Sequence, residues 1–111
     1  MSPKDIQAAL EKSGLRVCYR AWAEGREPEL PYVVWYFPQT DNLMADGAVY
    51  ERISDLNVEL YSESKDFESE RALERVLTEM FRAWQKSESW LESERMYEQL
   101  YEGGLIVDDD S

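Results

Sequence analysis

Histidine is absent from the 111-residue sequence, and cysteine occurs once, at Cys18. Nucleophilic triads that use a histidine base are therefore excluded, and Cys18 has no histidine to activate it. The same shortage removes the usual ligands of zinc. One cysteine cannot form an internal disulfide, which is typical of proteins in a reducing cytoplasm. From these absences we expect a protein that is not an enzyme and carries no cofactor.

Long hydrophobic runs are absent as well. The longest uninterrupted apolar segment covers residues 32–37, far short of the roughly 20 residues that a membrane-spanning helix needs. The first ten residues, MSPKDIQAAL, contain no apolar core of a signal peptide. We therefore expect a chain that is made in the cytoplasm and has no membrane partner.

Basic residues are few, with 12 lysines and arginines against 24 acidic residues, so the formal net charge is −12. Such a surface repels phosphate, and we expect no direct binding to nucleic acid. Tryptophan and tyrosine, by contrast, are plentiful, with four and seven copies. Interfaces are enriched in both residue types. They can equally fill the core and cover sheet edges, and composition leaves the two uses open.

The first third of the chain predicts one helix followed by two strands. Ser2 is a good N-cap, Pro3 suits the first helical position, and Gly14 ends the segment. Residues 15–23 alternate between apolar and polar side chains, which indicates a strand with one solvated face. Residues 32–37 are continuously apolar and β-branched or aromatic, which indicates a strand covered on both faces or at an interface.

The second half predicts an extended segment and a longer helix. Residues 48–64 read as extended chain, in which Leu56, Val58 and Leu60 alternate with polar neighbours. A bulge or kink at residues 54–55 leaves open one bent strand or two shorter strands. Residues 66–84 follow helical spacing behind the N-cap Asp66. Its predicted buried face consists of Phe67, Leu73, Val76, Leu77, Met80, Phe81 and Trp84. Residues 90–102 fit a helix by propensity and a strand by alternation, and the pattern does not decide between them.

The predicted fold class is α+β, with a mainly antiparallel sheet of about four to five strands and two helices packed on one face. A long loop separates the second strand from the third. We expect a single domain over residues 1–102, because the chain has the size of one domain. Residues 103–111, GGLIVDDDS, read as a flexible acidic tail.

The loop at residues 39–47 concentrates the candidate site residues. Asp41, Asn42 and Asp46 resemble a calcium loop in composition, but Leu43 and Met44 lie where an EF-hand needs ligands. Aspartate and asparagine also form turns, which is the alternative interpretation. Apolar side chains at a loop tip gain nothing in a monomer, and buried in a neighbour each contributes about 1.5–3 kcal/mol.

We therefore predict that this loop is an arm that contacts a neighbouring protein. The predicted contact residues are Trp35, Asp41, Asn42, Leu43, Met44 and Asp46. We predict no catalytic, cofactor-binding or metal-binding residue.

Short motifs between residues 15 and 102 resemble a family of small phage and prophage tail components, described as minor capsid or tail completion proteins. They are Leu30-Pro31-Tyr32, Asp41-Asn42, Ala45-Asp46, Val49-Tyr50, Val58, Glu59-Leu60-Tyr61, Lys65-Asp66, Glu92-Ser93-Glu94 and Tyr97. The family pattern favours a strand for the late segment MYEQLY. None of these motifs is catalytic.

The resemblance implies a tail-terminator-like structural protein that joins head and tail. Its subunits would form a homo-oligomeric ring, commonly of six, and bind the tail tube and connector proteins of the virion. It would occur first in the bacterial cytoplasm and then in the tail or neck. An acidic ring would let DNA pass without binding it. The alternative is an acidic protein-binding module, such as an inhibitor, an immunity-type protein or a DNA mimic.

Overall fold

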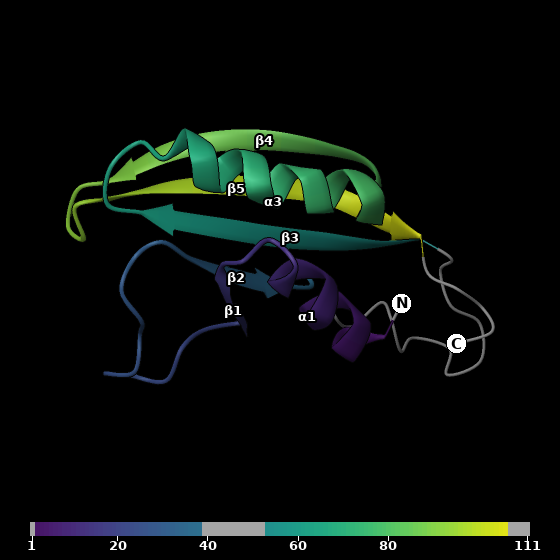
Figure 1. The fold of residues 1–111 in the computed structure, drawn as a ribbon, viewed down its shortest axis with the longest axis horizontal. Helices are drawn as coiled ribbons and strands as arrows, with labels where there is room; N and C mark the ends of the chain where they lie inside the picture. The colour runs from purple at the N-terminus through teal and green to yellow at the C-terminus, as the bar shows by residue number, and fades with distance from the viewer. Residues whose placement is uncertain (1, 39–52, 107–111) are drawn as a thin grey trace.

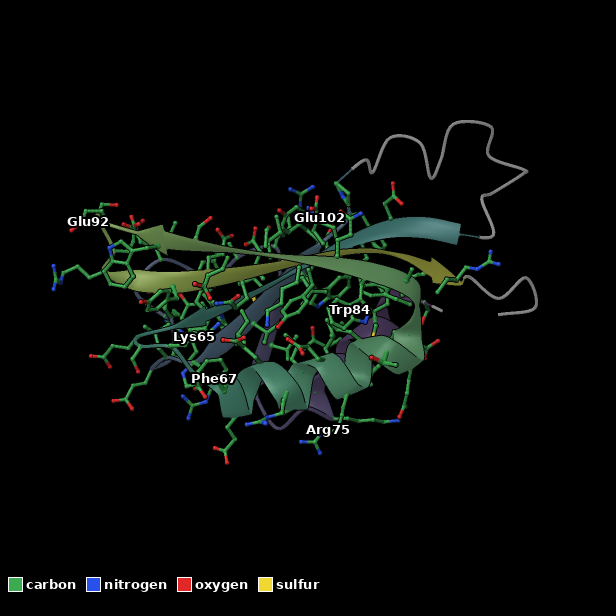
Figure 2. All side chains as sticks on the ribbon, turned by 90° about the horizontal axis from the view of Figure 1, so that it is seen from above. Lys65, Phe67, Arg75, Trp84, Glu92 and Glu102 are labelled. Carbon is green, nitrogen blue, oxygen red and sulfur yellow. The ribbon has the colours of Figure 1, made fainter. Side chains whose placement is uncertain are left out.

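The computed structural model describes residues 2–38 and 53–106 (Figure 1). The elements are α1 (Pro3–Glu11), β1 (Arg16–Tyr19), β2 (Tyr32–Tyr36), β3 (Ile53–Ser62), α3 (Phe67–Met80), β4 (Phe81–Leu91) and β5 (Met96–Ile106). The strands form one sheet in the order β1-β2-β3-β5-β4. Among the strand pairs of the described residues, β1–β2 is parallel and the others are antiparallel. Both helices lie on one face of the sheet (Figures 1 and 2), so the predicted α+β class is confirmed.

Helix α1 begins where the sequence predicts and ends at Glu11, shortly before the predicted stop at Gly14. The Ser2 hydroxyl accepts a hydrogen bond from the backbone N–H of Asp5 at 3.2 Å, and the Asp5 carboxylate accepts one from the N–H of Ser2 at 3.1 Å. This capping box satisfies two N–H groups of the first turn. Gly14, with φ of +86°, follows the helix in a conformation that favours glycine. Ile6 and Leu10 are buried against the sheet.

The core lies between the helices and one face of the sheet. Strand register places Val33 opposite Leu60, and Val58 opposite both Trp35 and Tyr101. Because side chains alternate along a strand, all of these point to the same face. The buried core residues are Ile6, Leu10, Val17, Val33, Trp35, Leu56, Val58, Leu60, Leu73, Leu77, Met80, Phe81, Tyr101 and Leu105.

Helix α3 is shorter than predicted. Asp66 caps it as expected, accepting from the N–H of Ser69 at 3.0 Å, but the helix ends at Met80 and Phe81 is already extended, with φ of −104° and ψ of 147°. Residues 81–84 belong to β4, because pairing with β5 outweighs their helical spacing. Phe67 is 61% exposed and does not belong to the buried face, since it begins the helix beside Lys65, whose Nζ lies 4.9 Å from its ring centroid.

The ambiguous segment at residues 90–102 contains the end of one strand, a turn and most of the next strand. Strand β4 continues to Leu91, and β5 begins at Met96. The predicted tail is wrong for residues 103–106, which extend β5 and pair with β3 from Leu56 back to Ile53. The physical reason is burial, because Leu105 is 1% exposed. Residues 107–111 lie outside the described range.

Within residues 2–38 and 53–106, no helix combines the length and apolar character needed to cross a membrane.

Candidate functional site

The predicted contact arm falls outside the described residues. This applies to Asp41, Asn42, Leu43, Met44 and Asp46. Their predicted role in contacts with a neighbouring protein stays a prediction from the sequence.

Trp35 is the one predicted contact residue that the structure places. Its indole is 2% exposed and belongs to the core. The Nε1 of Trp35 donates a hydrogen bond to Oε1 of Gln7 at 2.8 Å, and the ring lies 4.8 Å from that of Tyr19. Trp35 also lines a shallow hollow of about 400 Å³ with Tyr19 and Phe37. This hollow is a place where a partner would reach Trp35.

The face of the sheet opposite α1 and α3 is the strongest candidate for a functional surface. We call it the helix-free face. Its side chains from the central strands are Tyr32, Val34, Tyr36, Asn57, Glu59, Tyr61, Glu98, Leu100 and Glu102. They alternate with the core residues of the same strands, and Figure 2 shows Glu102 pointing away from α3 while Trp84 points toward it.

Two tyrosine hydroxyls on this face converge on one carboxylate. Tyr36 donates a hydrogen bond to Oε2 of Glu59 at 2.9 Å, and Tyr61 donates to Oε1 of Glu59 at 2.6 Å. The Tyr61 hydroxyl also lies 3.4 Å from Oε2 of Glu98. The side-chain amide of Asn57 donates to the Tyr36 hydroxyl at 3.3 Å. These contacts thus hold together side chains from three neighbouring strands, β2, β3 and β5.

The cluster changes the protonation of its members. Partial burial, followed by contact with the Glu59 carboxylate, raises the pKa of Glu98 above its ordinary value. Burial and the hydrogen bond to Glu59 also raise the pKa of Tyr61, and burial raises the pKa of Tyr36. Both phenols therefore stay protonated near neutral pH. They act as hydrogen-bond donors, while the carboxylates can accept from a partner.

A small hollow of about 200 Å³ borders this cluster near β1. Its lining includes Arg20, Trp22, Tyr32 and Tyr61. The rings of Trp22 and Tyr32 meet edge to face, with centroids 5.9 Å apart. The Nε1 of Trp22 is buried and makes no hydrogen bond within the part of the chain that the structure describes. Val34 is 5% exposed beneath this segment, so the segment covers one end of the helix-free face.

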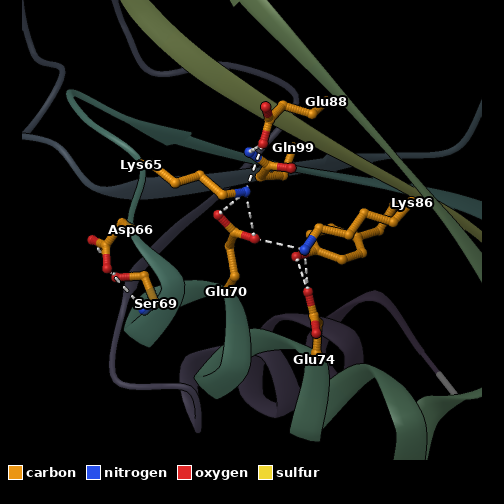
Figure 3. A network of polar contacts seen from close by, with 9 residues as sticks. Lys65, Asp66, Ser69, Glu70, Glu74, Lys86, Glu88 and Gln99 are labelled. Carbon is orange, nitrogen blue, oxygen red and sulfur yellow. Dashed lines mark hydrogen bonds and ion pairs between the residues drawn. The ribbon is translucent and has the colours of Figure 1, made fainter.

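A second polar cluster lies on the other side of the sheet, between α3 and β4 (Figure 3). Glu70 is 3% exposed and contacts two lysines. Lys86 Nζ lies 2.6 Å from Oε1 of Glu70. Lys65 Nζ lies 3.1 Å from Oε1 and 2.8 Å from Oε2, of which only the first contact has hydrogen-bond geometry. Lys86 also reaches Glu74 at 2.7 Å, and Lys65 reaches Glu88 at 2.6 Å.

This second cluster holds the helix onto the sheet. Burial opposes ionisation of Glu74, but hydrogen bonds from Lys86 and Tyr101 outweigh it and lower the pKa of the carboxyl. Hydrogen bonds to Glu70 and Glu88 raise the pKa of Lys65. The lysines and the carboxylates of Glu74 and Glu88 are thus charged near neutral pH and form ion pairs, because the pKa of each lysine is raised and that of each of these carboxyls is lowered. Such an arrangement compensates for the burial of charge.

Alternation along two strands was a usable signal for the helix-free face, which was not among our predictions. Asn57, Glu59 and Tyr61 alternate with buried residues of β3, and Glu98 and Leu100 do the same in β5. A strand assignment for both segments would have placed these side chains on one face. What the sequence did not contain is the adjacency of β3 and β5.

Across the two described segments, no group of three or more acidic, cysteine or histidine side chains is arranged to hold a metal ion. In comparisons with known proteins, no family model, no curated protein and no solved structure matches this chain.

Proposed function

We propose that this chain is a structural assembly protein of the tail or neck of a long-tailed phage or prophage, acting as a tail-terminator or tail-completion component. The observation that carries the proposal is the helix-free face, on which Tyr36 and Tyr61 are fixed over the central strands beside Glu59. The motif resemblance between residues 15 and 102 supplies the biological setting.

The residue types on this face suit protein association. Tyrosine offers a rigid apolar ring and a hydroxyl, so it contributes contact area at a low cost in side-chain entropy. Tyr36 and Tyr61 are half-buried and already oriented by Glu59. A partner that covers them need not order them first, which lowers the entropic cost of binding.

In the proposed setting the chain associates with itself in a ring and contacts tail-tube and connector proteins. The net charge of −12 is consistent with DNA passing such a ring without adhering. The protein would be made in the host cytoplasm and become part of the virion.

Coexpression with tail-tube and connector proteins tests the proposal. We expect co-purification and ring-shaped particles by electron microscopy. Leu100→Asp, on the helix-free face, should abolish co-purification, whereas Thr78→Asp on the exposed side of α3 should not. A chain that stays monomeric at high concentration and binds neither protein would rule the proposal out.

One observation favours the acidic binding module as a second candidate. Glu59, Glu98 and Glu102 lie on neighbouring strands of the helix-free face, and no lysine or arginine of β2, β3 or β5 accompanies them. The complementary partner would be a basic protein surface. Recovery of a basic nuclease or DNA-binding protein, lost in Glu59→Gln, would favour this candidate over virion assembly.

A further inference from the structure

Strand β4 forms an open edge of the sheet. It is 11 residues long and last in the strand order, with β5 on its inner side. Figure 1 shows no other element of the described chain beyond it. Its backbone groups on the outer side are therefore available to pair with another strand, and a long, regular edge of this kind is a ready template.

The sequence of this edge is complementary to itself when read in opposite directions. If two copies pair antiparallel with Ser87 opposite Ser87, then Lys86 lies opposite Glu88 and Trp84 opposite Trp90. The same register puts Gln85 opposite Ser89. Directly opposed residues share a face of the sheet and interact, and pairs of opposite charge or of two aromatic rings stabilise the ladder.

The structure supports this register in two ways. Trp84 through Leu91 pair with β5 without interruption, and the irregularity in β4 lies between Phe81 and Trp84, outside the complementary stretch. Trp90 is 43% exposed in the single chain, and Trp84 of a second copy would cover it. Each tryptophan is already held by a tyrosine, Trp90 by Tyr97 at 4.9 Å and Trp84 by Tyr101 at 5.5 Å.

A lysine in an edge strand often prevents pairing, because it brings charge into the new sheet. Here the Lys86 side chain points to the helix side, where its Nζ donates to Glu70 and Glu74. In the antiparallel register its neighbour across the interface is the Glu88 carboxylate, not an apolar group. The charge is thus neutralised on both sides of the contact.

We infer that two copies of this chain associate through β4 in an antiparallel pair centred on Ser87, forming one continuous sheet. The contact is isologous and closes on itself, so it yields a dimer and by itself no ring. It needs no virion partner and stands independently of the proposed function, which is tested by ring formation and partner binding.

Cysteine cross-linking tests the register directly. In a Cys18→Ser background, Ser87→Cys should form a disulfide-linked dimer on mild oxidation, because directly opposed residues have Cα atoms about 4.5–5.5 Å apart, within disulfide range. Gln85→Cys is the matched control. It lies more than about 10 Å from its own copy in this register and should link only when mixed with Ser89→Cys.

Equal linking by Gln85→Cys alone and by Ser87→Cys would overturn the register. A Ser87→Cys variant that retains Cys18 tests an alternative contact between copies. A link between residue 87 and Cys18 of another copy would mean that β4 pairs head-to-tail with β1, which contradicts the two-fold contact.

Charge substitutions at Ser87 test the same contact without disturbing the fold, since Ser87 is exposed. Ser87→Lys and Ser87→Glu should each weaken dimerisation about fivefold in sedimentation equilibrium, because like charges then face each other. Their equimolar mixture should restore it. Ser89→Lys has the same net charge as Ser87→Lys but faces Gln85, and should dimerise like the parent chain. Failure of the mixture to recover, or a monomeric parent chain at all concentrations, would refute the inference.

Discussion

Glu70 is an acidic residue that is only 3% exposed. Its ion pairs with Lys65 and Lys86 compensate for the loss of hydration on burial. Replacing it with alanine removes the carboxylate that Lys65 and Lys86 share. Breaking a buried ion pair costs about 3–5 kcal/mol. Each lysine keeps a second carboxylate here, Glu88 or Glu74, so we expect Glu70→Ala to lower the free energy of unfolding by about 2 kcal/mol.

Urea denaturation measures this difference, with Glu88→Ala as the matched control. Glu88 is the more exposed end of the same network, pairs with Lys65 and accepts a hydrogen bond from the side-chain amide of Gln99 at 2.8 Å. Its replacement should cost clearly less than that of Glu70, because exposed ion pairs contribute little. Equal effects of the two substitutions would show that burial of Glu70 does not determine the stability of the network.

The negative charge of Glu98, in contrast, is expected to destabilise the native state. Because burial and the Glu59 carboxylate raise the pKa of Glu98 above its ordinary 4.5, the native state keeps this proton at pH values where the unfolded chain has released it. The contribution of Glu98 to the free energy of unfolding is therefore complete below pH 4.5 and falls as the pH rises through the native pKa.

We expect Glu98→Gln to raise the free energy of unfolding at pH 7.5 by up to about 1 kcal/mol, since it removes a like-charge cross-strand contact. At pH 4 the variant and the parent chain should have nearly the same stability, because Glu98 is then protonated. Thermal unfolding at the two pH values checks both statements. A larger gain at pH 4 than at pH 7.5 would contradict the sign.

Features that depend only on residues a few positions apart could be predicted from the sequence. Ser2 and Asp66 are N-caps, as predicted, because a cap depends on residues within three positions. Phe67 was misassigned to the core because helical spacing does not reveal where the helix lies relative to the sheet. Its 61% exposure follows from its place at the first turn.

At the scale of elements, the junction between α3 and β4 depends on a glycine in another strand. A Cβ atom on Gly103 would lie 2.7 Å from the carbonyl oxygen of Ala83 and 2.7 Å from Cδ2 of Phe81. Phe81 is the first residue after the helix and is 6% exposed. The turn from helix to strand without a loop is thus possible because β5 has no side chain at this point.

We expect Gly103→Ala to destabilise the fold by about 1–3 kcal/mol, the usual cost of overpacking a core. Glu102→Ala, at the adjacent and exposed position of β5, should stay within about 0.5 kcal/mol of the parent chain. Guanidinium denaturation of both variants measures the difference. A Gly103→Ala chain as stable as the parent would show that Phe81 moves aside at little cost.

This junction also explains why the end of α3 could not be predicted from the sequence. Met80, Phe81 and Trp84 continue the helical spacing of the preceding residues. Between Trp84 and Trp90 every residue is polar, so no alternation predicts a strand there, and pairing with β5 selects that structure. The long-range contact outweighs local propensity, as it does for most strands.

At the scale of the whole molecule, the α+β class followed from the order of elements, whereas the strand order did not. Strands β4 and β5 are consecutive in the sequence, but the position of β5 between β3 and β4 is determined by tertiary contacts. That choice puts Glu98 beside Tyr61 and creates the cluster on the helix-free face. Because the sequence does not reveal this adjacency, it pointed to the loop and not to the sheet surface as the contact site.

Self-association through β4 and binding to a basic protein should respond differently to salt, because the net charge of the chain is large. Two copies carrying −12 each repel one another, and added salt screens that repulsion, with a Debye length of about 10 Å at 0.1 M and about 3 Å at 1 M. The cross-copy Lys86–Glu88 pairs are also screened, but each contributes only about 0.2–1 kcal/mol. We therefore expect self-association through β4 to strengthen as sodium chloride rises from about 0.05 to about 0.5 M.

Binding of the carboxylates on the helix-free face to a basic protein would show the reverse dependence, because attraction between opposite charges weakens with screening. Sedimentation velocity of the chain alone, and of the chain with its captured partner, measures both trends in the same buffers. Ser89→Lys, which changes the net charge to about −11 and faces the uncharged Gln85 in the dimer, should dimerise like the parent chain at high salt and at most slightly better at low salt. Dimerisation that weakens steadily with salt would mean that ion pairs, and not the strand ladder, hold the copies together.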